Sequence, residues 1–222
     1  WGPEVRLSSL PDDSEEPSVS VSGQLVIVVW QDGIWGALEV YCKRSTDGGA
    51  TWGADTRLTN NSSYSSSAST YINGEIVHLV WYDDRDGDEE IYYKRSTDGG
   101  VSWGVDTRLT NNPSNSDYPS IHFSDNVLHL VWRDDRDGST NSEIYYKRST
   151  DEGITWGADT RLTNNTGYSD IASVFASGSS VHIVWYDDRD GNTNKEIYYK
   201  QSTNSGANWG PDTRLTNNTA SS

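Results

Sequence analysis

Residues 103–112 read Trp-Gly-Val-Asp-Thr-Arg-Leu-Thr-Asn-Asn, and this stretch recurs from Trp52, Trp156 and Trp209, with a weaker copy from Trp1. Successive copies begin 51, 51, 53 and 53 residues apart. Self-similarity at a fixed period is the mark of a repeat architecture, and a period near 50 is longer than that of most solenoid repeats. The chain therefore consists of four similar units, preceded by the end of a further one.

Each unit contains four predicted strands. The first is a short run such as residues 118–123, and the second is an almost continuous apolar run, as in residues 181–185, which indicates burial on both faces. The third reads Glu-Ile-Tyr-Tyr-Lys from Glu90, Glu143 and Glu196, and the fourth reads Asp-Thr-Arg-Leu-Thr. Gly, Asn and Asp clusters separate the strands, as turns require.

Four strands per unit without helical periodicity predict an all-β fold, a β-propeller with four blades of four antiparallel strands. The predicted blades span residues 9–59, 60–110, 111–163 and 164–216 of a single domain, 1–222. Residues 1–8 form an additional outer strand in this scheme.

The turn between the third and fourth strands has its own motif, Ser-Thr-Asp-Gly-Gly-Ala-Thr-Trp over residues 45–52. It returns at 96–103 and 149–156, while the copy at 202–209 carries Asn204 in place of Asp. In such a turn Asp accepts backbone N–H bonds, Gly supplies positive φ and Trp packs over the hairpin.

The motif resembles the Asp-box, or bacterial neuraminidase repeat, Ser-x-Asp-x-Gly-x-x-Trp, over essentially the whole chain. In that family the box lies on the outer rim, away from any active site, so the resemblance implies a structural role. The residues concerned are Ser45, Asp47, Gly49, Trp52, Ser96, Asp98, Gly100, Trp103, Ser149, Asp151, Gly153, Trp156, Ser202, Gly206 and Trp209.

The strand count suggests self-assembly. A closed four-bladed ring seats four outer strands, but the chain supplies five, so one terminal strand is surplus and can add to a neighbouring molecule. Such a contact is head-to-tail and builds a ring or a fibre. The predicted contact residues are Glu4, Val5, Arg6, Leu7, Asp212, Thr213, Arg214 and Leu215. Two alternatives remain open: the extra strand frays, or the chain is a window from a larger propeller.

A loop of the first blade is a further candidate for this interface. Blades two to four read Asp-Asp-Arg-Asp-Gly after the second strand, whereas the first blade has Ile34 and Trp35 in that loop. An apolar pair at a loop tip is a candidate contact surface. Local packing over the first blade explains the pair equally well.

The net charge is −16, which disfavours binding to nucleic acids and to anionic membrane surfaces. No apolar run is long enough to span a membrane. Clustered carboxylates are ligands for hard cations, so calcium is a possible cofactor. The candidate ligands are Asp83, Asp84, Asp86, Asp88, Asp134, Asp135, Asp137, Asp187, Asp188 and Asp190. Arg85, Arg136 and Arg189 lie inside these clusters, and ion-paired turns are the alternative.

The remaining signals concern the compartment. Cys42 is the single cysteine, there is no Met, and the chain starts at Trp1, so we expect a removed signal peptide or an excised segment. Acceptor sequons occur at Asn60, Asn61, Asn164 and Asn217, in predicted surface loops. An extracellular or cell-surface location is expected.

Catalysis is not expected from the sequence. Sialidases use a Tyr nucleophile, and the family's enzymes also carry an arginine triad and an Arg-Ile-Pro motif, which is absent here. Arg, Tyr and Asp recur at equivalent positions in every blade, whereas an active site needs an asymmetric set. His78, His129 and His182 are repeat-equivalent to each other and to Ile27, which indicates packing.

The expected function is thus a non-catalytic, extracellular structural or binding module that self-assembles through a terminal strand. One alternative is a carbohydrate-binding propeller with Tyr82 and Tyr186 as sugar platforms, although their equivalents are Gln31 and Arg133. A second alternative is a blade array from a larger sialidase-like secreted protein.

Overall fold

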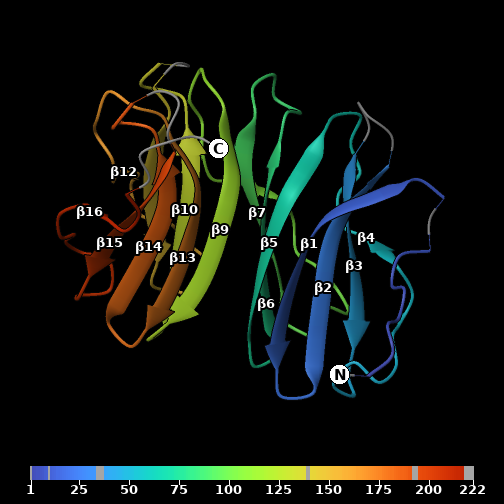
Figure 1. Cartoon of the computed structure of the whole chain (residues 1–222). Coiled ribbons are helices and arrows are strands. Elements are labelled where there is room, and N and C mark those ends of the chain that lie inside the picture. Colours follow the sequence, from blue (N-terminus) through green and yellow to red (C-terminus); the bar gives the residue numbers. More distant parts are fainter. Residues whose placement is uncertain (1, 10, 34–37, 139–140, 192–194, 218–222) are drawn as a thin grey trace.

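The computed structural model describes residues 2–9, 11–33, 38–138, 141–191 and 195–217. Within these residues every regular element is a strand, and the strands form four antiparallel four-stranded sheets in chain order. No helix able to cross a membrane is found in the described part of the chain. The architecture is an all-β propeller with four blades (Figure 1).

The strands of the first two blades have these bounds: β1 (Asp13–Ser22), β2 (Leu25–Gly33), β3 (Glu39–Ser45), β4 (Thr56–Arg57), β5 (Ser65–Asn73), β6 (Ile76–Asp83), β7 (Glu90–Ser96) and β8 (Thr107–Arg108). Those of the last two blades are β9 (Ser116–Ser124), β10 (Val127–Asp134), β11 (Glu143–Ser149), β12 (Thr160–Arg161), β13 (Ser169–Ser177), β14 (Ser180–Asp187), β15 (Glu196–Ser202) and β16 (Thr213–Arg214).

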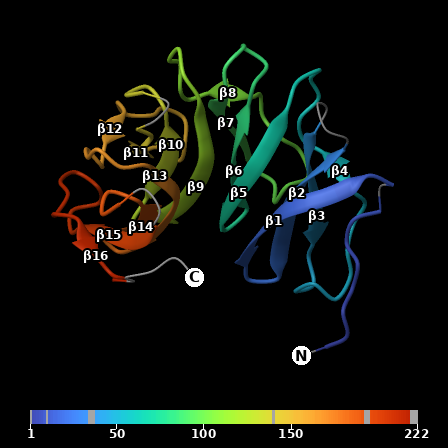
Figure 2. The ribbon, with the colours of Figure 1, turned by 45° about the horizontal axis from the view of Figure 1, so that its top comes forward.

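The four blades lie on an arc with the first strand of each blade inside and the short fourth strand outside (Figure 2). β1 contacts β5, β5 contacts β9, and β9 contacts β13. In the described residues the fourth blade makes no comparable contact with the first, so the arc is open between them.

Apolar side chains fill the space between successive blades. Trp81, Trp132 and Trp185, each near the end of the second strand of its blade, are almost fully buried. The interface between the second and third blades combines Val80 and Ile91 with residues of β9 and β10. Burying such side chains stabilises each interface by about 1.5–3 kcal/mol per residue.

A bulge interrupts the start of every inner strand. The pairing register shifts at the equivalent place in all four blades. The residue there has a left-handed φ of 45–50° in each case: Glu16, Ser67, Tyr118 and Ile171. Because a bulge bends the strand and re-aims its side chains, it turns the beginning of each inner strand at the edge that carries the candidate site described below.

The predicted extra outer strand over residues 1–8 is not formed. Residues 2–9 lie outside the sheets, although the Leu7 carbonyl accepts a hydrogen bond from Lys43 and Ser9 bonds to Asp55. A strand needs a partner edge to satisfy its backbone groups, and no fifth blade is present among the described residues to offer one. At the other terminus, β16 pairs with β15 in its own blade.

Candidate functional site

The blades differ from one another at the edge where the second strands end and the inner strands begin, the upper edge in Figure 1. The residue that follows the buried Trp varies along the arc: it is Gln31, Tyr82, Arg133 and Tyr186 in the four blades. Opposite these residues across the first strand pair are Glu15, Ser66, Asp117 and Asp170. This edge therefore gathers an asymmetric set of polar side chains from a repetitive scaffold.

Arg133 is the centre of this set. Its guanidinium is ion-paired with Asp117 on β9 and is hydrogen-bonded to the Tyr168 hydroxyl, just before β13. Its Nη1 atom is 3.7 Å from Asp170 Oδ2, and its Nε atom is 3.8 Å from Asp135 Oδ1. One arginine thus joins the third and fourth blades, with its positive charge surrounded by carboxylates.

A coupled pair of carboxyl groups lies beside it. Asp117 is buried, and desolvation raises the pKa of Asp117 to about 9, with the Arg133 charge lowering it and the neighbouring Glu89 raising it. Burial likewise raises the pKa of Glu89. The pair therefore holds a proton at neutral pH, as expected of two adjacent acids that cannot both ionise.

The buried Arg133 Nε has no hydrogen-bond partner among the described residues, whereas the protonated Asp117 is hydrogen-bonded to Glu89. Buried polar atoms without a partner cost free energy, so a native structure that keeps them calls for an explanation.

Tyrosine rings surround the charged groups. The Arg133 guanidinium carbon lies 5.3 Å from the ring centre of Tyr118 and 5.6 Å from that of Tyr168. Tyr82 packs edge-on against Tyr118 and stacks on Tyr64, with centroids 6.0 Å apart in both cases. The rings offer apolar faces next to hydrogen-bonding groups, the combination usual in sites for small polar ligands.

On the fourth blade, the Tyr186 hydroxyl donates to Asp170, and Lys195 Nζ lies 4.1 Å from the Tyr186 ring centre. Burial and the Asp170 carboxylate raise the pKa of Tyr186, which therefore remains a neutral donor. On the first two blades, Gln31 accepts hydrogen bonds from Ser66 and from the Ser67 N–H. The site thus extends over all four blades, with an acid group on each of them, that of the first blade being Glu15.

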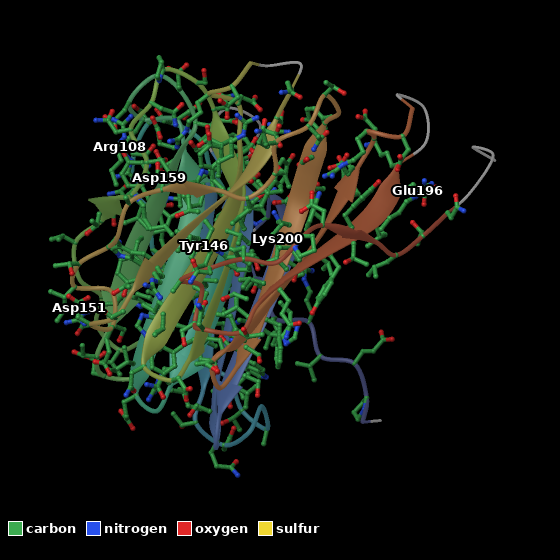
Figure 3. All side chains as sticks on the ribbon, turned by 90° about the vertical axis from the view of Figure 1, so that its left-hand side faces the viewer. Arg108, Tyr146, Asp151, Asp159, Glu196 and Lys200 are labelled. Carbon is green, nitrogen blue, oxygen red and sulfur yellow. The ribbon has the colours of Figure 1, made fainter. Side chains whose placement is uncertain are left out.

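The Ser-x-Asp-x-Gly-x-x-Trp turns lie elsewhere. In the first of them Gly49 N–H donates to Ser45 Oγ at 2.9 Å and Thr51 N–H donates to Asp47 at 2.8 Å. Hydrogen bonds from Thr51 and Ser45 lower the pKa of Asp47 to about 2. In Figure 3 the labelled Asp151 of the third turn lies at the outer edge of the molecule.

The turn tryptophans connect neighbouring blades. Trp156 packs edge-on against Tyr93 of the preceding blade at 5.3 Å, and Trp209 packs in the same way against Tyr146 at 5.0 Å. Tyr146 also bonds to His129 Nδ1 at 2.7 Å. The three repeat-equivalent histidines therefore serve packing: burial lowers the pKa of His129 to about 4, which keeps the ring neutral.

The acidic loops are tied to arginine. Arg85 bonds to the buried Asp83 at 2.6 Å and to Asp106 at 2.8 Å, and Lys94 pairs with Asp106 at 2.7 Å. The same arrangement holds in the last two blades through Arg136 and Arg189. No group of three or more His, Cys, Asp or Glu among the described residues is placed to hold a metal ion. Calcium binding stays a prediction, and the geometry favours its ion-paired alternative.

Other predicted residues are spread over the molecule. Asn60, Asn164 and Asn217 are exposed, whereas the Asn61 amide donates to Ser65 and Asp83, bonds that a glycan there would disturb. Glu4, Val5 and Arg6 are exposed at the N-terminal end, and Asp212, Thr213, Arg214 and Leu215 form or flank β16. Ile34 and Trp35 lie outside the described residues. Cys42 is buried, which raises the pKa of its thiol to about 12.

No protein-family model matches the chain, and no curated protein matches it. Several solved structures, by contrast, match the fold of the chain. A Trypanosoma rangeli sialidase bound to the inhibitor DANA superimposes with a TM-score of 0.68 at 16% identity, covering 89% of this chain and 37% of its own. A GH93 α-L-arabinofuranosidase of Fusarium graminearum gives 0.67 at 17% identity, with 94% and 68% coverage.

An N-acetylgalactosamine deacetylase from F. plautii, bound to blood group B trisaccharide, gives a TM-score of 0.63 at 17% identity, covering 92% of this chain and 71% of its own. The fold is therefore that of sialidase-like propellers. The chain spans little more than a third of the sialidase's length.

These comparisons overturn the expectation that the chain is not an enzyme, because the proteins that share its architecture are a sialidase, a deacetylase and an arabinofuranosidase. The argument behind that expectation, that Arg, Tyr and Asp recur at equivalent positions in every blade, was also wrong. The blades are alike on their outer parts but differ at the edge where the second strands end and the inner strands begin. The signal was present in the sequence, since Arg133 and Gln31 break the repeat where the other blades carry Tyr82 and Tyr186.

Proposed function

We propose that the cluster around Arg133 and Asp117 is a carbohydrate site of the glycoside-hydrolysing type. The observation that carries the proposal is the Glu89–Asp117 acid pair, set beside one arginine and several tyrosine rings where the blades differ. The carbohydrate-acting enzymes of the same architecture support it.

The residues divide the work by chemistry. The ring faces of Tyr118 and Tyr168 offer apolar surface for the C–H face of a sugar, and the Arg133 guanidinium beside them offers hydrogen bonds to its hydroxyl groups. The raised pKa of Asp117 makes it a proton donor at neutral pH. In hydrolysis Asp117 protonates the leaving glycosidic oxygen, water adds to the anomeric carbon, and the water's proton passes to the Glu89–Asp117 pair.

The charge balance favours neutral sugars over acidic ones. Arg133 already faces the Asp170 and Asp135 carboxylates and the acid pair that contains Asp117, so little positive charge is left for a substrate carboxylate. The net charge of −16 further opposes an anionic ligand. We therefore assign neutral pentosides or hexosides to this site, encountered outside the cell.

A panel of fluorogenic aryl glycosides, with neutral sugars and one sialoside, together with a glycan array tests the proposal. We expect hydrolysis of a neutral glycoside, a loss in kcat of about 10²-fold or more in Asp117→Asn, and retained binding. Tyr118→Ala should weaken binding instead. Val105→Ala, in an exposed outer loop, is the matched control and should change neither. Absence of both binding and hydrolysis, or an Asp117→Asn variant as active as the parent, would refute the assignment.

A further inference from the structure

The three interfaces between blades are built from repeat-equivalent residues. Each blade presents a front face, formed by its second, third and fourth strands, to the back face of the next blade. In the second blade the front face includes Val80, Ile91 and Leu109, all buried against the third blade. In the third blade the equivalents are Val131 and Ile144, buried with Leu162 against the fourth.

The front face of the fourth blade has the same chemistry but no cover. Its equivalent residues are Val184, Ile197 and Leu215, which are 37%, 40% and 56% exposed. The equivalent side chains of the three preceding blades are all 9% exposed or less. The fourth blade thus carries the apolar half of an interface that the chain forms three times internally.

The back face of the first blade is the complementary half. Val19 and Val21 of β1 are 62% and 58% exposed, whereas their equivalents in the third blade, Ile121 and Phe123, are buried. Beside them a hollow of about 210 Å³ is lined by residues that include Pro17, Val28 and Trp30. Both halves of one more interface are therefore free on the described part of the chain.

Polar links between blades follow the same repeat. Arg44, Arg95 and Arg148 each donate to a carbonyl in the turn of the following blade, at Gly99, Glu152 and Ser205. The fourth blade has Gln201 at this position, whose amide can donate to the equivalent first-blade carbonyl, that of Gly48.

A second link joins each third-strand lysine to the preceding blade. Lys94 and Lys147 donate to the carbonyls of Leu58 and Leu109. In the first blade Lys43 donates instead to Leu7, in the segment that precedes β1. Residues 2–8 therefore occupy part of the place that a preceding blade would take.

We propose that two copies of this chain associate head-to-tail, with the fourth-blade front face of one copy packed on the first-blade back face of the other. Leu215 of the incoming copy then displaces Leu7 and accepts the hydrogen bond from Lys43. β16 remains in its own blade while the N-terminal segment is displaced, because Asp212, next to β16, is ion-paired with both Arg189 and Lys200. The contact is heterologous, so it propagates until the arc closes. The proposal does not depend on the carbohydrate site.

Sedimentation velocity over a range of concentrations, at 0.15 and 0.5 M NaCl, measures this association. Because each copy carries a net charge of −16, mutual repulsion opposes assembly and added salt should strengthen it. Val184→Glu and Val19→Glu each place a charge on one face, at positions exposed in the single chain, and each should weaken association at least tenfold. Val105→Glu, in an outer loop and 85% exposed, is the control that should leave it unchanged.

Two further samples separate this contact from other modes. An equimolar mixture of Val184→Glu and Val19→Glu keeps one intact interface, so it should form a 1:1 dimer where each variant alone is monomeric. Deleting residues 1–8 removes the competitor for Lys43 and should tighten association several-fold.

Three results overturn the proposal: monomers at 0.5 M NaCl for both the full and the shortened chain, no dimer in the mixture, or association abolished by the deletion. The last result would assign assembly to donation of the N-terminal strand. Monomers throughout would mean that something other than a second copy covers these faces.

Discussion

Replacing Asp117 by Asn tests the acid pair through stability rather than activity. The pKa of Asp117 in the folded chain is raised to about 9 from an ordinary value of 3.8. Well below pH 4 the Asp117 carboxyl is neutral in both the folded and the unfolded chain, so it does not change the free energy of unfolding. As the pH rises from about 4 to about 9, the unfolded chain ionises while the folded chain keeps the proton, so the parent loses stability. The amide side chain of the variant cannot ionise and escapes this loss.

The size of the effect follows from the same values. At pH 7 the folded state must retain a proton that the unfolded state releases, which costs up to about 4 kcal/mol at roughly 1.4 kcal/mol per pH unit. The stability that Asp117→Asn gains over the parent is smaller than this for two reasons. In the parent the proton is shared with Glu89, and the variant loses the interaction between Asp117 and Arg133. We therefore expect Asp117→Asn to gain on the parent by at least about 1 kcal/mol between pH 5 and pH 8.

Urea unfolding followed by Trp fluorescence at pH 5, 6.5 and 8 provides the assay. Asp187→Asn is the control. Burial alone would raise the pKa of Asp187, but hydrogen bonds from Arg189 and Ser169 outweigh that effect and lower the pKa. Removing a carboxylate of that kind costs a stability that is constant over this pH range. If the difference in unfolding free energy between Asp117→Asn and the parent were equally independent of pH, the shared proton would be refuted.

Three further predictions concern the scaffold and are read by thermal or urea unfolding. Leu130→Ala, in the fully buried core between the second and third blades, should cost about 2–5 kcal/mol. Asp98→Ala should lower the melting temperature more than Asp98→Asn, since Asn204 makes the same turn bonds in the fourth blade; equal losses would contradict the turn geometry. Arg136→Ala leaves the buried Asp134 without its ion pair and should cost about 3–5 kcal/mol, whereas a neutral outcome would mean that the pair is not needed.

The blade architecture was predictable because it depends on many repeated residues. Trp81 and its equivalents recur 51 or 53 residues apart, and burial of an aromatic in every blade leaves few alternatives to a propeller. The turn motif predicted its own hydrogen bonds, since Ser45 and Asp47 act on backbone groups only two to four residues away. Local interactions of this kind can be derived from spacing alone.

The candidate site was missed because its residues are distant in sequence. Glu89, Asp117 and Asp170 come from three blades, and only the bulge at the start of each inner strand, with Tyr118 at φ 48°, brings them to one edge. The raised pKa values of Glu89 and Asp117 depend on burial, which the sequence does not give. The lack of repeat at Arg133 was visible, but its meaning follows only from knowing that this position faces the inner edge of the arc.

A crystal structure of the chain soaked with the best-bound neutral oligosaccharide tests most directly whether one asymmetric sugar site lies where the blades differ. We predict one sugar per chain, stacked on Tyr118 or Tyr168 and hydrogen-bonded to Asp117 and Arg133. A sugar repeated once per blade, or one bound at the outer-rim turns, would contradict this assignment.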